Sequence, residues 1–161
     1  KVDLPQFTVI VDTTGYSFSV TSGENNQFVI VDDKATEISS EICNVRNDTL
    51  FINCSPRYGL TIVCKEVKAI IVKNAEWLYI TDLSSEALYL KLEKVHSAIN
   101  NLKVGTFNFD VSNETRCDAN NIEVETLTGK LSNSRFNIYS SKIRRSSIEQ
   151  LDEKNQNMII Y

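Results

Sequence analysis

A weak repeat of about 20 residues runs through positions 67–145 of this chain. The segment at 87–92 returns at 106–111 and again at 126–131. Each copy alternates apolar and polar residues, which is typical of a β-strand. A strand-like repeat this short forms one coil of a β-solenoid, whose stacked coils bury a shared core. The sequence therefore predicts an all-β solenoid of about four coils over 67–145.

Stacking the copies brings apolar residues into inward columns. The predicted columns are Leu88, Phe107 and Leu127; Leu90, Phe109 and Gly129; Leu78, Ser97, Cys117 and Phe136; and Leu83, Leu102 and Ile122. Gly129 fits its column least well, because it has no side chain to bury. Ile70 and Val72 would join a first coil if they stack on Leu88 and Leu90, which would make this coil slightly shorter than the others.

Outward positions support the same stacking. Two predicted outward columns alternate in charge: Lys91, Asp110 and Lys130; and Lys103, Glu123 and Lys142. Opposite charges on neighbouring strands attract, so alternation stabilises a stack. Lys73, placed above Lys91, interrupts this pattern. Because any β-rich chain can be slid against itself to give apolar columns, an antiparallel sandwich remains the alternative fold.

The residues on either side of the repeat are predicted to cap it within one domain, 1–161. Strand-like alternation over 1–66 and a turn at Asn47-Asp48 indicate N-terminal strands and hairpins. These would cover one end of the solenoid, because an exposed edge strand invites pairing with other chains. Residues 146–161 would cover the other end.

Composition excludes several classes of function. The net charge of −4 lacks the basic excess that nucleic acids require, so we expect no nucleic-acid partner. No stretch reaches the 18 or more apolar residues of a membrane-spanning helix. The chain opens with Lys1 rather than Met, which suggests a processed product whose secretion signal has been removed.

No residue pattern predicts catalysis, a metal site or a cofactor. Cys43, Cys54, Cys64 and Cys117 form no C-x-x-C pair, so we expect buried thiols, with a disulfide among the first three as the alternative. His96 has no partner at a catalytic spacing and is expected to point outward. The candidate acid pairs for glycoside chemistry are Asp32-Asp33, Glu123 with Glu125, and Asp152-Glu153, and all fit turns or solvated faces better.

Aromatic residues supply the candidate binding site. Trp77 and Tyr79 flank the inward Leu78, so both should project outward, and Tyr89 could extend their surface. An exposed aromatic surface stacks on sugar rings or packs against a protein partner. The alternative is that the N-terminal cap covers these rings.

The chain resembles the bacterial "putative auto-transporter adhesin" family with a head GIN domain, which is related to the DUF4097-like β-solenoid proteins. The matching segments are 7–11, 18–23, 47–52 and 70–80, followed by coils of about 20 residues. Coil corners in that family are rich in Gly and Ser, whereas here they carry Asn, Glu and Lys. The resemblance implies a right-handed, single-stranded β-helix exported to the cell envelope.

These observations predict a non-enzymatic β-solenoid, in the cell envelope or secreted, that presents a repetitive surface to a glycan or protein partner. A polysaccharide-acting enzyme on the same scaffold is one alternative, with Asp110 or Lys91 as the residues to test. A structural or assembly protein is the other. The sequence does not identify the ligand or the oligomeric state.

Overall fold

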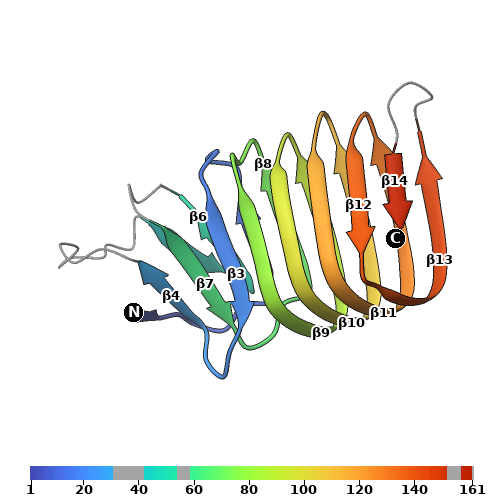
Figure 1. Ribbon diagram of the computed structural model, residues 1–161. Coiled ribbons are helices and arrows are strands. Elements are labelled where there is room, and N and C mark those ends of the chain that lie inside the picture. Colours follow the sequence, from blue (N-terminus) through green and yellow to red (C-terminus); the bar gives the residue numbers. More distant parts are fainter. Residues whose placement is uncertain (31–41, 54–58, 152–156, 161) are drawn as a thin grey trace.

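The computed structural model describes residues 1–30, 42–53, 59–151 and 157–160. Over these ranges the chain is all β and folds as a β-solenoid of about four coils, as predicted (Figure 1). No helix occurs in the described ranges, and hence none that could cross a bilayer. The strands are β1 (Val2–Asp3), β2 (Val9–Asp12), β3 (Phe18–Ser22), β4 (Gln27–Ile30), β5 (Cys43–Arg46), β6 (Thr49–Ile52), β7 (Leu60–Cys64), β8 (Ala69–Lys73), β9 (Leu78–Glu93), β10 (His96–Ser112), β11 (Arg116–Ser132), β12 (Arg135–Tyr139), β13 (Lys142–Gln150) and β14 (Asn157–Ile160).

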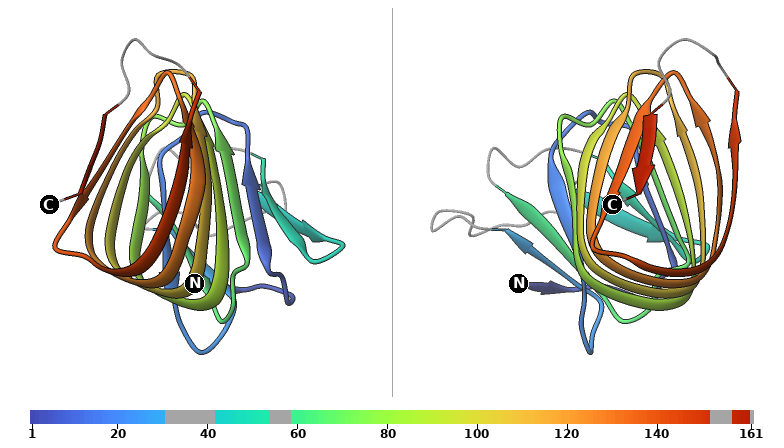
Figure 2. Two further views of the ribbon diagram at one scale, coloured as in Figure 1. Left: turned by 90° about the vertical axis from the view of Figure 1, so that its right-hand side faces the viewer. Right: turned by 45° about the vertical axis from the view of Figure 1, so that its right-hand side comes forward.

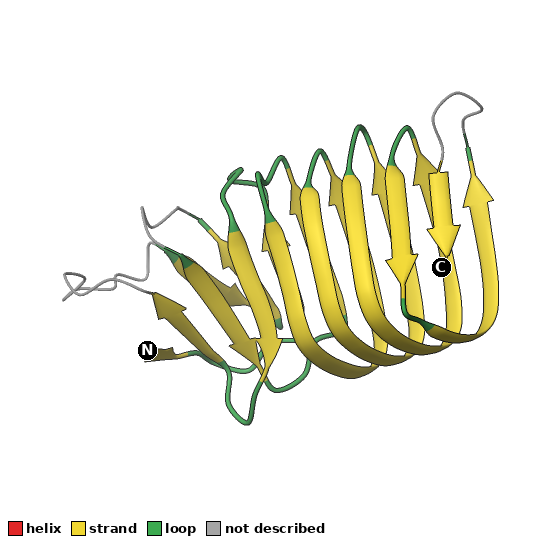
Figure 3. Cartoon of the chain, in the orientation of Figure 1, coloured by secondary structure: helices red, strands yellow, loops and turns green. Residues whose placement is uncertain are grey.

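The long strands β9, β10 and β11 each make most of one coil. Each descends a front sheet, bends at the base and rises through a back sheet while the chain advances to the right (Figure 1). This winding is right-handed, and the end-on view in Figure 2 shows the coils as nested rings. The front sheet follows the order β4, β7, β3, β9, β10, β11, β12, β14, and the back sheet the order β6, β2, β8, β9, β10, β11, β13. Strands make up nearly the whole coil, with short loops at the top (Figure 3).

The register confirms the predicted inward columns. Ser97 pairs with Leu78 on one side and Cys117 on the other, and Phe107 pairs with Leu88 and Leu127. Both relations are parallel, and all of these residues are buried. A parallel stack buries one face of every strand against the core, which is why the apolar alternation persists from coil to coil.

Gly129 fits its column because an aromatic ring occupies the space beside it. A Cβ atom at Gly129 would lie 2.6 Å from ring atoms of Phe109, its partner on the preceding coil. The Phe109 ring also meets Phe136 edge-on from the front sheet, at 4.7 Å between centroids. The missing side chain therefore makes room for a contact that joins the two sheets across the core.

The predicted register of the first coil was wrong. Ile70 pairs with Leu90 and Val72 with Leu92, so the true partners lie two positions further along β9 than predicted. Lys73 consequently lies beside Glu93 instead of Lys91, and their charged groups are 3.2 Å apart. The hydrogen bond from Lys73 lowers the pKa of the Glu93 carboxyl. The interruption in the charge pattern was thus an error of alignment.

Left-handed residues turn the chain at the coil corners. Asp82, Asn101, Asn121 and Ser140 occupy one corner in successive coils, all at φ between 51° and 57°. The Asn101 amide donates to Asp82 at 2.8 Å, and the Asn121 amide donates to Asn101 at 2.7 Å. Asn and Asp tolerate this conformation, and their side chains here also link one coil to the next.

The N-terminal strands add further coil segments but stack out of chain order. Strand β2 lies between β6 and β8 in the back sheet, and β3 lies between β7 and β9 in the front sheet, all in parallel. The chain therefore forms one coil from β2 and β3 first. It then places β6 and β7 on one side of this coil, and returns to place β8 and β9 on the other side. The segment Thr13-Thr14-Gly15 that follows β2 does not join an antiparallel pair, because β2 and β3 belong to different sheets.

Antiparallel pieces and polar residues cover the two ends. The predicted hairpin at Asn47-Asp48 joins β5 to β6, with both turn residues at positive φ, and β4 and β1 cover the end of the front sheet. In the last coil the exposed Ser146 and Gln150 pair in register with the buried Leu127 and Leu131. Polar residues at these inward positions suit a coil that no further coil covers.

Candidate functional site

An aromatic cluster on the outer face of the front sheet is the main candidate site. Trp77 and Tyr79 stack with 5.6 Å between ring centroids and 12° between planes. They remain 38% and 40% exposed, so the N-terminal cap does not cover them. His96 of the next coil places its ring 5.4 Å from that of Trp77. We call Trp77, Tyr79 and His96 the aromatic platform.

Small residues beside the platform leave its rings open. Tyr79 pairs with Ser19 of β3 on one side and Ala98 of β10 on the other. Ser17 precedes the strand pair Phe18 and Leu78, so it lies level with Trp77. Bulky side chains at these positions would fill the outer surface beside the rings. The register therefore holds two nearly parallel rings at the surface of a rigid sheet, where a flat ligand can stack.

Tyr89 lies on the other sheet. It comes after Tyr79 on the same bent strand, beyond the bend, and pairs with Ala69 of β8 in the back sheet. Its side chain is partly exposed, and it belongs to no ring contact with the platform. The structure thus brings Trp77 and Tyr79 together but places Tyr89 on a separate surface.

Polar side chains continue the front face beyond the platform. Arg116 follows His96 in register, and its Nε donates to Asp118 at 2.9 Å. The amide of Asn137 donates to the other oxygen of Asp118 at 2.6 Å. Asp118 is therefore held by two neighbours, and Arg135 lies next to Arg116 on the following coil. The sequence reasoning did not single out Arg116 or Arg135, although their spacing matches the repeat.

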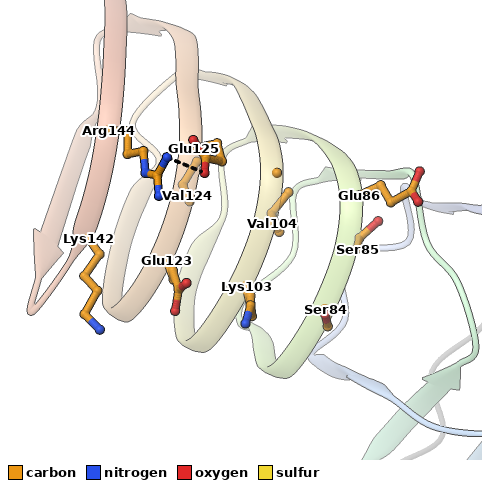
Figure 4. Close-up of a pocket in the computed structure, with 11 residues that line it drawn as sticks. Ser84, Ser85, Glu86, Lys103, Val104, Glu123, Val124, Glu125, Lys142 and Arg144 are labelled. Carbon is orange, nitrogen blue, oxygen red and sulfur yellow. Dashed lines mark ion pairs between the residues drawn. The ribbon is translucent and has the colours of Figure 1, made fainter.

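A hollow of about 570 Å³ at the base of the coils is a second candidate surface. In Figure 4 Lys103, Glu123 and Lys142 project from successive coils in one row, with Glu86, Glu125 and Arg144 in another. Arg144 and Glu125 form an ion pair at 3.3 Å. Gly105 deepens the hollow, because a Cβ there would lie 2.7 Å from the carbonyl oxygen of Glu86. Its charges alternate and so largely compensate one another.

The acid pairs proposed for glycoside chemistry show no catalytic arrangement in the described residues. Glu123 and Glu125 are both exposed in the basal hollow, and Glu125 is engaged by Arg144. Asp110 and Lys91 pair in register on the outer face of the back sheet. The other two pairs, Asp32-Asp33 and Asp152-Glu153, lie outside the described residues.

Asp12 is a buried acid that the sequence did not indicate. It is fully buried, in register with Ile52 on one side and Val72 on the other. One carboxylate oxygen accepts hydrogen bonds from the backbone and hydroxyl of Thr14, and the other has no partner among the described residues. Burial raises the pKa of Asp12, against the opposing effect of the Thr14 bonds. We interpret Asp12 as a turn-forming residue that tolerates partial desolvation.

The cysteines that the structure describes are buried. Burial raises the pKa of Cys64 and of Cys117 to about 12, so neither thiol is a reactive nucleophile at neutral pH. Both are free thiols. Cys43 is also buried, and Cys54 lies outside the described residues. Within the described ranges no three His, Cys, Asp or Glu residues cluster in a way that could hold a metal ion.

Comparison with known proteins gives a loose structural likeness only. No family model matches the chain, and no curated protein matches it in sequence. The alignment with a Bacteroides fragilis structure described as a "putative adhesin" covers 98% of this chain and 93% of the Bacteroides chain, at 13% identity and a TM-score of 0.39. A "putative adhesin" from Parabacteroides merdae aligns with 94% of each chain, at 9% identity and a TM-score of 0.35. These TM-scores are too low to establish a shared fold, so membership of the head GIN family stays a prediction.

Proposed function

We propose that this chain is a non-enzymatic binding module, in the cell envelope or secreted, that holds a glycan or protein partner against the aromatic platform. The observation that carries the proposal is the exposed, nearly parallel pair of Trp77 and Tyr79 on the outer face of a sheet. An exposed aromatic pair forgoes the free energy that burial in the core would supply, and it offers an apolar surface that a ligand can cover.

The scaffold supports such a role. Parallel strands on both sides hold Tyr79 of β9, and Trp77 lies directly before β9, where its carbonyl oxygen accepts a hydrogen bond from the Phe18 backbone N–H at 3.1 Å. Sites built on regular elements keep their geometry and so bind without a large ordering cost. Thr81 and Asn100, paired one step along the same face, supply hydrogen-bonding groups next to the rings.

Binding to glycan and matrix-protein arrays tests the proposal. Trp77→Ala should weaken binding about tenfold, the upper range for loss of an aromatic contact. Tyr89→Ala is the matched control, because it removes a ring from the same coil but from the back sheet. Equal binding by wild type and Trp77→Ala, or an equal loss in Tyr89→Ala, would contradict the proposed site. Fractionation of cells for the native protein tests the location, and residence in the cytoplasm would count against an envelope role.

A further inference from the structure

One outward row of the front sheet differs in charge from the rows elsewhere on the solenoid. Starting at the platform, its successive members are Trp77, His96, Arg116 and Arg135. Like charges placed directly opposite each other on neighbouring strands destabilise a sheet. Arg116 and Arg135 are such a pair, with their strands about 4.8 Å apart.

Other outward rows avoid this arrangement. On the back sheet the register runs through Lys91, Asp110, Lys130 and Glu149 with alternating charge. The basal row of Lys103, Glu123 and Lys142 alternates as well. The row with Arg116 and Arg135 therefore differs from these two alternating rows, and among the described residues the one carboxylate paired with it is Asp118, which binds Arg116.

The arginine pair is available to a ligand. Arg116 is 57% exposed and uses only its Nε for Asp118, which leaves its terminal nitrogens free of that bond. Arg135 is exposed, and no described carboxylate lies within ion-pair distance of it. Both arginines line a hollow of about 230 Å³, together with Glu114, Thr115, Asn133 and Ser134. Guanidinium groups bind carboxylates and sulfates through paired hydrogen bonds.

We propose that the ligand is an acidic glycan that lies along the solenoid axis, with one sugar ring on the aromatic platform and an anionic group at Arg116 and Arg135. This inference rests on the proposed function of the platform. Arg116 lies two coils from Trp77, or about 10 Å, and Arg135 about 14 Å away, a separation that a short oligosaccharide spans. The exposed rings favour a sugar over an acidic peptide, because the apolar face of a sugar ring stacks on an aromatic ring, whereas acidic side chains have no such face.

The single tryptophan of the chain makes the binding measurable. Titration of Trp77 fluorescence with tetragalacturonate and with a chondroitin sulfate tetrasaccharide should change the emission at submillimolar concentrations. The methyl ester of the first and the desulfated, carboxyl-methylated form of the second are both uncharged and should bind about tenfold more weakly, as should either acid at high salt. Arg135→Gln should weaken binding of the acids about three- to tenfold and leave the neutral forms unchanged. Lys142→Gln, which removes a charge from the basal row, should change neither.

The outcomes separate this inference from the proposed function. If Trp77→Ala abolishes binding in calorimetry while Arg135→Gln has no effect, the platform binds but the acidic class is wrong. Equal affinity for the acids and their neutral forms overturns the inference in the same way, and so does tighter binding of an acidic peptide such as hexaglutamate. If no oligosaccharide or matrix protein binds the wild-type chain, the proposed function fails together with the inference. Circular dichroism of each variant establishes that it has kept the β fold.

Discussion

From β9 onward each coil lies on the coil that precedes it in the chain, whereas the strands before β9 are stacked out of chain order. In the first region, paired residues are one repeat apart, as for Leu78, Ser97 and Cys117. In the second, Val9 pairs with both Thr49 and Ala69, which are much further along the chain. Both regions bury the same kind of inward column, so packing does not distinguish them.

The two regions differ in how far along the chain the strands lie that each coil needs as neighbours. A coil in the regular region contacts neighbours that the chain has just built or is about to build, so stability is nearly a sum of local terms. In the N-terminal region β2 separates β6 from β8, and β3 separates β7 from β9. Removing β2 and β3 takes the support from strands on both sides, although those strands lie far along the sequence.

Deletions of equal length in the two regions should give the largest contrast. Deletion of 98–117 joins Ser97 to Asp118, which stands in register with Ala98, and so removes one coil without changing the stacking. We expect this variant to fold and unfold cooperatively. Deletion of 3–22 removes β2 and β3, and we expect loss of the whole stability of about 5–15 kcal/mol. Circular dichroism and thermal unfolding measure both, and unfolding of the 98–117 variant would refute the independence of the regular coils.

Gly129 tests how tightly the regular region is packed. Gly129→Val should destabilise the protein by about 1–3 kcal/mol, because the new side chain would overlap the Phe109 ring. Phe109→Ala alone should cost about 3–5 kcal/mol, but in that background Gly129→Val should add less than it does in the wild type, because the overlapping ring is gone. Urea unfolding of the wild type, both single variants and the double variant measures this difference. Gly59→Ala in the N-terminal region is the control, since nothing lies within 4 Å of the position of its Cβ atom. A harmless Gly129→Val would show that the core can rearrange around this contact.

The sequence predicted the regular region well because neighbours in space are neighbours in the repeat. A shift by one repeat aligned the inward columns, and phase alone placed Trp77 and Tyr79 outward. Only the structure explains why a glycine fits the inward column at position 129, because the ring that fills its place belongs to the preceding coil. The same alignment could also have predicted that Arg116 and Arg135 lie side by side, since one repeat separates them.

The N-terminal order was not predictable in the same way. Paired strands in this region are about two or three repeats apart instead of one: β2 pairs with strands 40 and 60 residues further along the chain, and β3 with strands 42 and 60 residues further, so a shift by one repeat does not align them. The register error at Ile70 arose where this region joins the first regular coil. Nor did the local pattern show that Asp12 continues the inward column of Val72, since an acid beside Thr13-Thr14-Gly15 is typical of an exposed turn.

Asp12 occupies an inward column that holds Leu92 and Val111 in the regular coils. An acid at this position should make the stability of the N-terminal region sensitive to pH. Because burial raises its pKa in the folded state, folding favours the protonated acid. Stability should be greatest below the ordinary aspartate value of 3.8 and fall as the pH rises toward the raised value. Asp12→Asn keeps an acceptor for Thr14 and should stabilise the protein at pH 7 by on the order of 1 kcal/mol.

Urea unfolding of wild type and Asp12→Asn between pH 4 and 8 measures this effect. The gain from the substitution should shrink as the pH is lowered, because the wild-type carboxyl then becomes neutral as well. Asp110→Asn, on the outer face of the back sheet, serves as the control for loss of one acidic charge. A gain that is constant with pH would show that ionisation of Asp12 costs the fold nothing.

The smallest expected effect concerns the corner ladder, which orders the regular coils and includes Asp82, Asn101 and Asn121. Asn101→Gly removes two exposed amide hydrogen bonds but tolerates the φ of 57°, so it should cost only about 0.5 kcal/mol. Asn101→Ala loses the same bonds and must also adopt a left-handed conformation, which adds about 1 kcal/mol. Thermal unfolding of the two variants separates the bonds from the backbone. If both variants lose the same stability, Asn101 contributes through its hydrogen bonds and not through its tolerance of the left-handed conformation. The corners would then stabilise the stack of coils as well as turn the chain.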